Sequence, residues 1–237
     1  MLKIQNLSKH FGGIKAVNNC SFEIKKGKIT ALIGPNGSGK STIFNLISGV
    51  LKANSGKVLF DGKDITNMSV DKISNIGISR IFQKSRLFNN LTIKENLLLA
   101  FDNEDEKFWK SFFGLNNYTN EKGEKIKEML KLVKMNEHEG NNARNLSFGQ
   151  KRLVEIVRAI INPHKLLMLD EPVAGVTPLL RKELAQVLLK LKKQGETIFV
   201  IGGSVVIAIK GKVFFTKGAI ASEVGVPQFI TTSTLSI

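Results

Sequence analysis

The chain has 237 residues, of which 42% are hydrophobic and 23% charged, and its formal net charge is +15. The length suits one large globular domain or a core with an inserted lobe. No apolar run reaches the roughly 20 residues that span a bilayer, and the start MLKIQNLSKH lacks the apolar stretch of a secretory signal, so we expect a cytosolic chain. A single cysteine, Cys20, excludes an internal disulfide.

The positive charge favours an anionic partner such as a nucleotide, a nucleic acid or the inner leaflet of a membrane. The lysines are scattered and form no basic run with interleaved aromatic residues, which argues against a nucleic-acid groove. Charge alone therefore does not choose the partner.

The first part of the chain is predicted to form a small sheet that leads into a buried strand. Three strand-like runs, residues 2–7, 16–24 and 28–34, are separated by turns at Gly12–Gly13 and Lys26–Gly27. The third run leads directly into a glycine-rich loop.

After that loop, the spacing of apolar residues predicts a helix over residues 42–50, which Gly49 can close. Residues 57–62 indicate a short hairpin, and residues 76–83 a second core strand. From about 91–135 the periodicity is helical and the charge density rises. We interpret this segment as an inserted helical lobe.

The second half of the chain alternates helices and strands. A helix follows LSFGQ and ends at Pro163, and residues 166–170 are expected to form a fully buried strand that ends in a carboxylate. Thr177 can cap and Pro178 can open the next helix, and residues 197–202 form another strand, with only weak strands after it. This alternation predicts a parallel sheet with helices on its faces.

The glycine-rich loop lies between a buried strand and a helix and matches the pattern of a phosphate-binding loop (Walker A) at every required position. Its glycines let backbone amide groups face phosphates, while Lys40 reaches the outer phosphates and the hydroxyl of Ser41 binds magnesium. The predicted nucleotide-binding residues here are Gly34, Pro35, Asn36, Gly37, Ser38, Gly39, Lys40, Ser41 and Thr42.

Two consecutive carboxylates stand at the end of the strand over residues 166–170. Asp170, at the strand end, can hold the magnesium shell, and Glu171 is placed to polarise a water molecule at the terminal phosphate. Alone, Asp-Glu-Pro could be a helix entry. Together with the phosphate-binding loop, the pair predicts ATP and Mg²⁺ as ligands and ATP hydrolysis as the reaction.

These motifs resemble the ATP-binding cassette (ABC) proteins. LSFGQKR, from Leu146 to Arg152, is similar to the signature segment of that family, with Phe148 where glycine is commoner, and the three motifs follow in the order of the family. The resemblance covers nearly the whole chain to about Val200. It implies that Ser147, Gly149 and Gln150 contact the nucleotide of a partner subunit.

The resemblance also implies the fold class and the domain organisation. We expect an α/β chain with a P-loop NTPase core, a parallel sheet with helices on both faces, an antiparallel β subdomain and an inserted helical subdomain. Residues 1–237 would form a single ATP-binding domain, with the core and β subdomain in 1–85 and 160–237 and the helical subdomain, including the signature segment, in 86–159.

Three further positions match residues with a role in the family. Gln83 corresponds to the glutamine that touches magnesium and reports the nucleotide state to the membrane partner. Phe11 corresponds to the aromatic residue that stacks on adenine, with Val17 beside it. Phe11 and Val17 could each be core residues instead.

Within the family, FGGIKAVNNCSFEI and SRIFQKSRLFNNLTIKENLLLAF look like the importer subunits for branched-chain amino acids, with urea importers close behind. The resemblance implies a dimer with a sister ATP-binding subunit or a second copy, two membrane permeases, and a peripheral location at the cytoplasmic face of the cell membrane. The motion that couples hydrolysis to transport would pass through the lobe near Gln83. The transported substrate rests on the resemblance alone.

One position departs from the family. After the strand over residues 197–202 the family has a histidine that contacts the terminal phosphate, and this chain has Gly202-Gly203-Ser204. Two hypotheses remain besides a hydrolysing importer subunit: a degenerate half-site whose ATP acts as a dimerisation switch, and a soluble ABC ATPase acting on nucleic acid or ribosomes.

Overall fold

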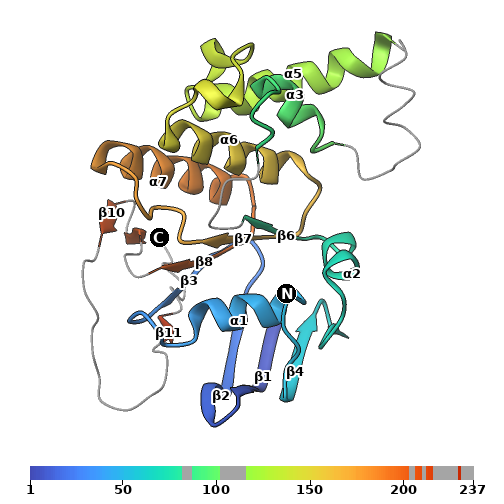
Figure 1. The fold of residues 1–237 in the computed structure, drawn as a ribbon, viewed down its shortest axis with the longest axis vertical. Coiled ribbons are helices and arrows are strands. Elements are labelled where there is room, and N and C mark those ends of the chain that lie inside the picture. The colour runs from blue at the N-terminus through green and yellow to red at the C-terminus, as the bar shows by residue number, and fades with distance from the viewer. Residues whose placement is uncertain (82–86, 102–115, 203–205, 210–211, 216–228, 231–237) are drawn as a thin grey trace. The chain divides into compact units, whose positions relative to one another are not determined.

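The computed structural model describes residues 1–81, 87–101, 116–202, 206–209, 212–215 and 229–230 (Figure 1). The chain divides into two compact units. The first comprises residues 1–83, 164–175 and 188–237, and the second comprises residues 84–163 and 176–187. Within the described residues, no helix is both long and apolar enough to cross a membrane.

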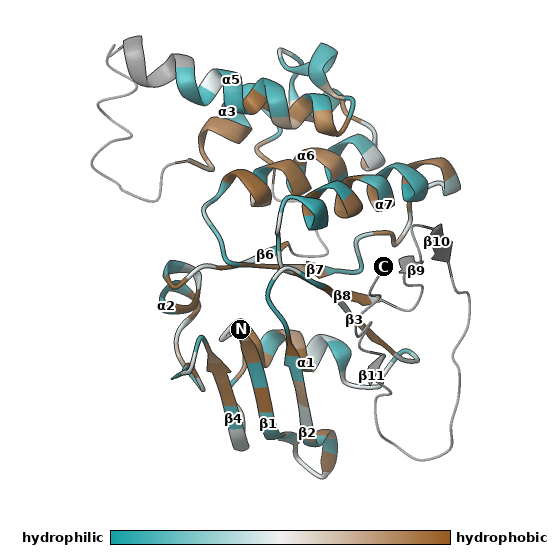
Figure 2. Cartoon of the chain, turned by 180° about the vertical axis from the view of Figure 1, so that it is seen from behind, coloured by the Kyte–Doolittle hydropathy of each residue, from teal (hydrophilic) through white to brown (hydrophobic). Residues whose placement is uncertain are grey.

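One sheet of the first unit is antiparallel and has the strand order β2-β1-β4-β5. Its strands are β1 (Leu2–Phe11), β2 (Ile14–Ile24), β4 (Ser55–Phe60) and β5 (Lys63–Asp64). Hydrophobic and hydrophilic residues are interspersed along β1 and β2 (Figure 2), and at the start of β1 the buried Leu2 and Ile4 flank the exposed Lys3, because one side of a strand faces the core and the other does not. The hairpin predicted at residues 57–62 is confirmed, with Asp61 and Gly62 both in the left-handed conformation that such a tight turn requires.

The second sheet of this unit has the order β11-β3-β8-β7-β6. Its strands are β3 (Ile29–Ile33), β6 (Ile78–Ile81), β7 (Leu166–Asp170), β8 (Ile198–Gly202) and β11 (Phe229–Ile230). The pairs β3–β8, β8–β7 and β7–β6 are parallel, and β11 is antiparallel to β3. A separate antiparallel pair is formed by β9 (Val206–Ile209) and β10 (Lys212–Phe215).

Helix α1 (Lys40–Ile47) lies between the two sheets of the first unit (Figure 1) and contacts β2, β7 and β8. Its fully buried residues Ile43, Phe44 and Ile47 join one apolar core with residues of both sheets. The ring centroids of Phe44 and Phe199 on β8 are 4.8 Å apart. A short helix, α2 (Val70–Asn75), precedes β6.

The second unit is helical. It contains α3 (Ile93–Leu98), α5 (Asn116–Leu132), α6 (Phe148–Ile161), the first part of α7 (Pro178–Lys193), and the short 3-10 turns Asn136–His138 and Ala143–Asn145. The three helices α3, α5 and α6 contact one another.

Local capping residues begin two helices of this unit. The cap predicted at Thr177 is confirmed, whereas α6 begins at Phe148, inside the LSFGQ segment and not after it as predicted. Ser147 caps α6, and the main-chain N–H of Leu180 donates to Thr177 Oγ1 (3.4 Å) at the start of α7. The α/β class and the mixture of parallel and antiparallel sheets expected from the sequence are confirmed.

Candidate nucleotide-binding site

The phosphate-binding loop connects β3 to α1, as the sequence predicts. Gly37 and Gly39 both have φ of 82°, a backbone conformation that L-residues with a side chain rarely adopt. Gly39 is also the residue that caps α1. A Cβ atom at Gly39 would overlap the carbonyl oxygen of Ala16 on β2, so the loop can lie against β2 only because residue 39 is glycine.

Replacing Gly39 by alanine is expected to destabilise the fold more than replacing Gly37, although the two backbones have the same φ. Each alanine costs about 1–2 kcal/mol for the left-handed conformation. Gly39→Ala costs about 1–3 kcal/mol more for the overlap. Among the described residues, no atom lies within 4 Å of a Cβ built on Gly37, so Gly37→Ala is the matched control. Urea unfolding of the two variants measures the difference, and equal stabilities would contradict the close packing against Ala16.

Lys40 is buried, and its ammonium group lies within the loop. Nζ donates to the carbonyl oxygens of Gly34 (2.7 Å) and Pro35 (2.6 Å) and lies 3.5 Å from Ser38 Oγ. Desolvation by burial lowers the pKa of Lys40, while the charge of Glu171 acts in the opposite direction. The carboxylate of Glu171 therefore stabilises the charged form of Lys40. Because the ammonium rests on neutral carbonyl oxygens, an incoming phosphate would offer it a stronger, charge-assisted bond.

Ser41 and Thr42 belong to the first turn of α1, and Ser41 is exposed. A hydroxyl group in the first turn of a helix stands beside the main-chain N–H groups that have no partner within the helix. The N–H groups and the hydroxyl group can therefore bind a phosphate oxygen, and the hydroxyl oxygen can also bind a hard cation that the phosphate holds.

The two carboxylates lie at the end of β7, as predicted. Asp170 is the last residue of the strand and is buried, and Glu171 follows it. The backbone of Glu171 has φ of 45°, which is uncommon for a residue other than glycine. Its main-chain N–H donates to the carbonyl oxygen of Ile201 (2.9 Å), which holds this conformation. Strained backbone of this kind is concentrated at functional sites in proteins.

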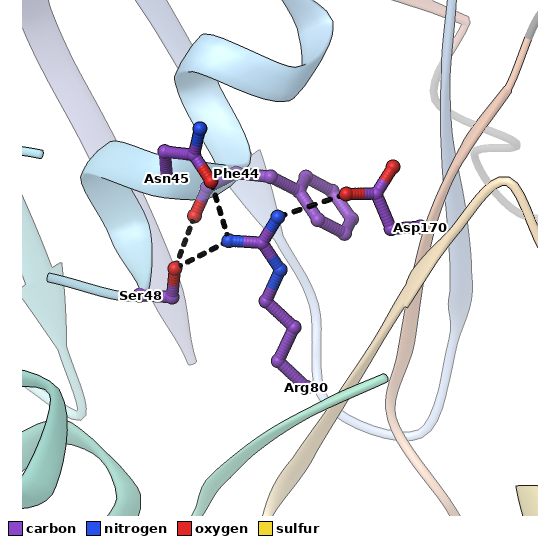
Figure 3. Close-up of polar contacts among 5 residues, drawn as sticks. All are labelled: Phe44, Asn45, Ser48, Arg80 and Asp170. Carbon is purple, nitrogen blue, oxygen red and sulfur yellow. Dashed lines mark hydrogen bonds and ion pairs between the residues drawn. The ribbon is translucent and has the colours of Figure 1, made fainter. Parts of the chain in front are cut away.

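Sequence reasoning missed a residue of this site, Arg80 on β6. Its guanidinium group forms an ion pair with Asp170, with Nη2 and Oδ2 2.8 Å apart (Figure 3). The signal was present: an arginine inside a strand otherwise composed of Ile and Ser requires a buried partner. The partner could not be identified without the strand order, which places β6 beside β7.

The predicted adenine-contacting residues lie on the hairpin formed by β1 and β2. Val17 is buried, and its Cγ2 lies 3.5 Å from where a Cβ of Gly39 would be. Phe11, at the end of β1, is 46% exposed, and Lys9 Nζ lies 5.1 Å from its ring centroid. The structure thus brings Val17 to the phosphate-binding loop, and it leaves the ring of Phe11 accessible.

The signature segment belongs to the second unit. Ser147 and Gln150 cap the start of α6 reciprocally: Ser147 N–H donates to Gln150 Oε1 (2.9 Å), and Gln150 N–H donates to Ser147 Oγ (3.2 Å). A Cβ on Gly149 would overlap the side chain of Leu180, and Phe148 is 57% exposed. The local role of these residues is therefore a helix start with an exposed aromatic residue beside it.

Gln150 has one further contact that sequence reasoning missed. Its Nε2 lies 3.4 Å from Nε2 of His138, whose Nδ1 lies 3.1 Å from Asn141 Nδ2. Two other predicted positions, Gln83 and Gly203, lie outside the described residues, as does Ser204.

A family model described as "ABC transporter" matches residues 17–174 of this chain. The probable branched-chain amino acid transport ATP-binding protein LivG of Archaeoglobus fulgidus is 40% identical over 213 residues, which cover 89% of this chain and 82% of that protein.

Two solved structures are also similar. The ADP conformation of MJ1267, an ATP-binding cassette of an ABC transporter, matches with a TM-score of 0.74 and 34% identity, covering 92% of this chain and 91% of that one. The dimeric structure of MJ0796, a bacterial ABC transporter cassette, matches with a TM-score of 0.69 and 26% identity, covering 86% and 88% of the two chains. The TM-score and the sequence identity are both lower for MJ0796 than for MJ1267.

Proposed function

The chain belongs to the ABC transporter family, and from this premise we propose that it binds and hydrolyses ATP to drive an importer for branched-chain amino acids. The observation that carries the proposal is the position of Lys40, which lies inside the glycine loop in the same unit as Asp170 and Glu171. The transported substrate is proposed from the similarity to LivG of Archaeoglobus fulgidus.

The loop is proposed to bind the phosphates of ATP. The N–H groups of the loop and of the first turn of α1 would face the phosphate oxygens, since the positive end of the helix dipole lies there. Lys40 would exchange its bonds to Gly34 and Pro35 for bonds to the outer phosphates. We assign this role to Gly34, Pro35, Asn36, Gly37, Ser38, Gly39, Lys40, Ser41 and Thr42.

The residues at this site fit a magnesium ion bound together with ATP. Hydroxyl and carboxylate oxygens are the hard ligands that Mg²⁺ prefers, and Ser41 and Asp170 supply one of each. Gln83 is a third proposed ligand. When bound, Mg²⁺ neutralises charge on the outer phosphates. Glu171 is proposed to orient the attacking water and to accept its proton, the role of a general base.

The base of ATP is proposed to lie against the ring of Phe11, with Val17 beside it. An exposed aromatic face offers stacking to a purine without requiring a preformed cavity. Exposure of the Phe11 ring and contact of Val17 with the loop both support this assignment.

A second ATP-binding subunit, identical or related, is the proposed partner. Ser147, Gly149 and Gln150 would then contact the ATP held by the other subunit, which agrees with their position at the exposed start of α6. Two membrane permeases complete the proposed transporter, and through them the chain would sit peripherally at the cytoplasmic face of the cell membrane. The solved structure of the similar cassette MJ0796 is dimeric.

One specific observation favours a second candidate function. Gly203 stands where the family has a histidine at the terminal phosphate, and glycine supplies no group that could bond there. In this alternative, ATP closes the dimer and hydrolysis takes place only in the partner.

Uptake by reconstituted vesicles tests the leading proposal. With this chain, its sister subunit and the two permeases in vesicles whose cytoplasmic side faces the lumen, we expect labelled leucine added outside to accumulate when ATP is enclosed in the lumen. A non-hydrolysable ATP analogue should abolish the accumulation, because closure without hydrolysis does not reopen the pair. Vesicles without this chain are the control. ATP-driven uptake of a different solute class, with none of leucine, would contradict the proposed substrate.

A further inference from the structure

Arg80 joins three elements of the first unit at the predicted magnesium site. Its Nη1 donates to Asn45 Oδ1 (2.7 Å) in the last turn of α1 and to Ser48 Oγ (2.7 Å) at the C-cap of that helix. Its Nη2 donates to Asp170 Oδ2 (2.8 Å) at the end of β7. Figure 3 shows the guanidinium group between the two sets of acceptors.

The guanidinium group is held on several sides. The side chains of Arg80 and Asp170 are 8% and 10% exposed. The Cζ atom lies 5.5 Å from the ring centroid of Phe44, and Ser48 Oγ, which accepts from Arg80, itself donates to the carbonyl oxygen of Phe44 (2.8 Å). Because guanidinium is a rigid planar fork, the bonds of Nη1 to α1 set the direction of the bond from Nη2 to Asp170.

Helix α1 begins at Lys40, inside the phosphate-binding loop, and continues the chain into the core of the first unit. Ser41, Asn45 and Ser48 are spaced four and three residues apart, so they share one face of this helix. Arg80 therefore ties the carboxylate of Asp170 to the same helical face that carries the hydroxyl of Ser41, the other proposed magnesium ligand. The ion pair also balances the charge of a buried carboxylate, which is costly when uncompensated.

We propose that Arg80 is a positioning residue for the magnesium site. It fixes the direction of the Asp170 carboxylate relative to Ser41, and it does so through Asn45 and Ser48. This inference rests on the proposed function, since it concerns the same site. It goes beyond that function by assigning a role to three residues outside the motifs, Arg80, Asn45 and Ser48.

The test is the magnesium dependence of nucleotide binding by Arg80→Lys. Lysine keeps the positive charge, but its single nitrogen lacks the planar fork that binds α1 and Asp170 together. We expect the Mg²⁺ concentration that gives half-maximal binding of a fluorescent ATP analogue to rise about tenfold, as is usual when a group that orients a metal ligand is lost. Binding of the analogue in EDTA should stay within about twofold of the parent.

Arg152→Lys is the matched control. Arg152 forms a buried ion pair with Glu155 (3.3 Å) in the second unit, with side chains 6% and 8% exposed. The same chemical change there is expected to lower the melting temperature without changing the magnesium dependence. A purely structural role of Arg80 predicts the same behaviour for Arg80→Lys, and that result would overturn the proposal.

A second variant keeps the test decisive where Arg80→Lys does not fold. The double substitution Asn45→Ala and Ser48→Ala removes the anchor on α1 and leaves the ion pair with Asp170 in place. It should raise the required Mg²⁺ concentration in the same direction, by less than Arg80→Lys. A lower Mg²⁺ requirement in either variant would identify Arg80 as a cation that competes with magnesium and would overturn the proposal.

Binding by the parent chain and binding by the variants test the proposed function and the role of Arg80 separately. If the parent binds no ATP analogue in either Mg²⁺ or EDTA, the proposed function fails and the inference fails with it. If the parent binds the analogue with Mg²⁺ but the variants have its magnesium dependence, the inference alone fails.

Discussion

Glu171→Gln is expected to lower phosphate release from MgATP at least a hundredfold and to leave ATP binding intact. A positioned general base contributes about 10²–10⁴-fold to a rate, and an amide cannot accept the proton of the attacking water. Glutamine has nearly the same volume, and the bond from the main-chain N–H of residue 171 to Ile201 does not involve the side chain. Bound ATP should be held as tightly or more tightly, because a negative charge that acts on the region of Lys40 is removed.

The measurement is phosphate release by the purified chain, run beside nucleotide binding. Glu183→Gln is a suitable control, since Glu183 is paired with Lys134 (3.4 Å) in the second unit and the same change there should leave the rate unaltered. Unchanged turnover in Glu171→Gln would remove Glu171 from the proposed role.

The same assay distinguishes the two candidate functions through Gly203→His. If the parent turns over and Glu171→Gln abolishes turnover, the half-site is competent without the histidine of the family. If the parent binds ATP but only Gly203→His releases phosphate, this chain is an ATP-binding half whose catalysis comes from its partner.

Lys40→Met is expected to weaken ATP binding by about 10–100-fold with a small change in fold stability. Hydrogen bonds to charged groups contribute about 1.5–3 kcal/mol each, and the methionine side chain has a similar length without a donor. The fold should tolerate the change because burial already disfavours the charge of Lys40, as its lowered pKa indicates. The carbonyl oxygens of Gly34 and Pro35 each lose a donor, which offsets part of this relief.

Titration with a fluorescent ATP analogue measures the loss, and thermal unfolding measures the stability. Lys125→Met removes the same charge from an exposed site on α5, where Lys125 is paired with Glu128 (3.2 Å). If Lys125→Met weakened binding as much as Lys40→Met, the effect would arise from the net charge of +15 and not from contacts in the loop.

Features set by neighbours in the sequence were predicted correctly. The cap of α7 at Thr177 depends on residues directly beside it, and the turn at Asp61–Gly62 depends on two residues that accept positive φ. The strand over residues 166–170 was predicted because all its residues but the last are apolar, and all five are buried. The predicted helix over residues 42–50 is shorter and begins earlier, at Lys40, since Gly39 already serves as its cap.

Features that join distant segments were not predicted. Arg80 is 35 residues from Asn45 and 90 from Asp170, and only the adjacency of β6 and β7 brings them together. The need for glycine at residue 39 was assigned to phosphate binding alone, whereas the structure adds the carbonyl group of Ala16, which β2 places against the loop.

The sequence by itself determined the family and the motifs of this protein: a lysine and a serine in a glycine loop, two carboxylates at the end of a buried strand, and a signature segment beside a helix. These depend on backbone conformation and hydrogen bonds within a few residues, which local composition controls. The tertiary structure decided which groups hold these motifs in place, above all the bridge from Asp170 through Arg80 to α1. A buried charge must find its partner across strands, and the pairing of strands is set by packing of the whole core and not by the residues next to it.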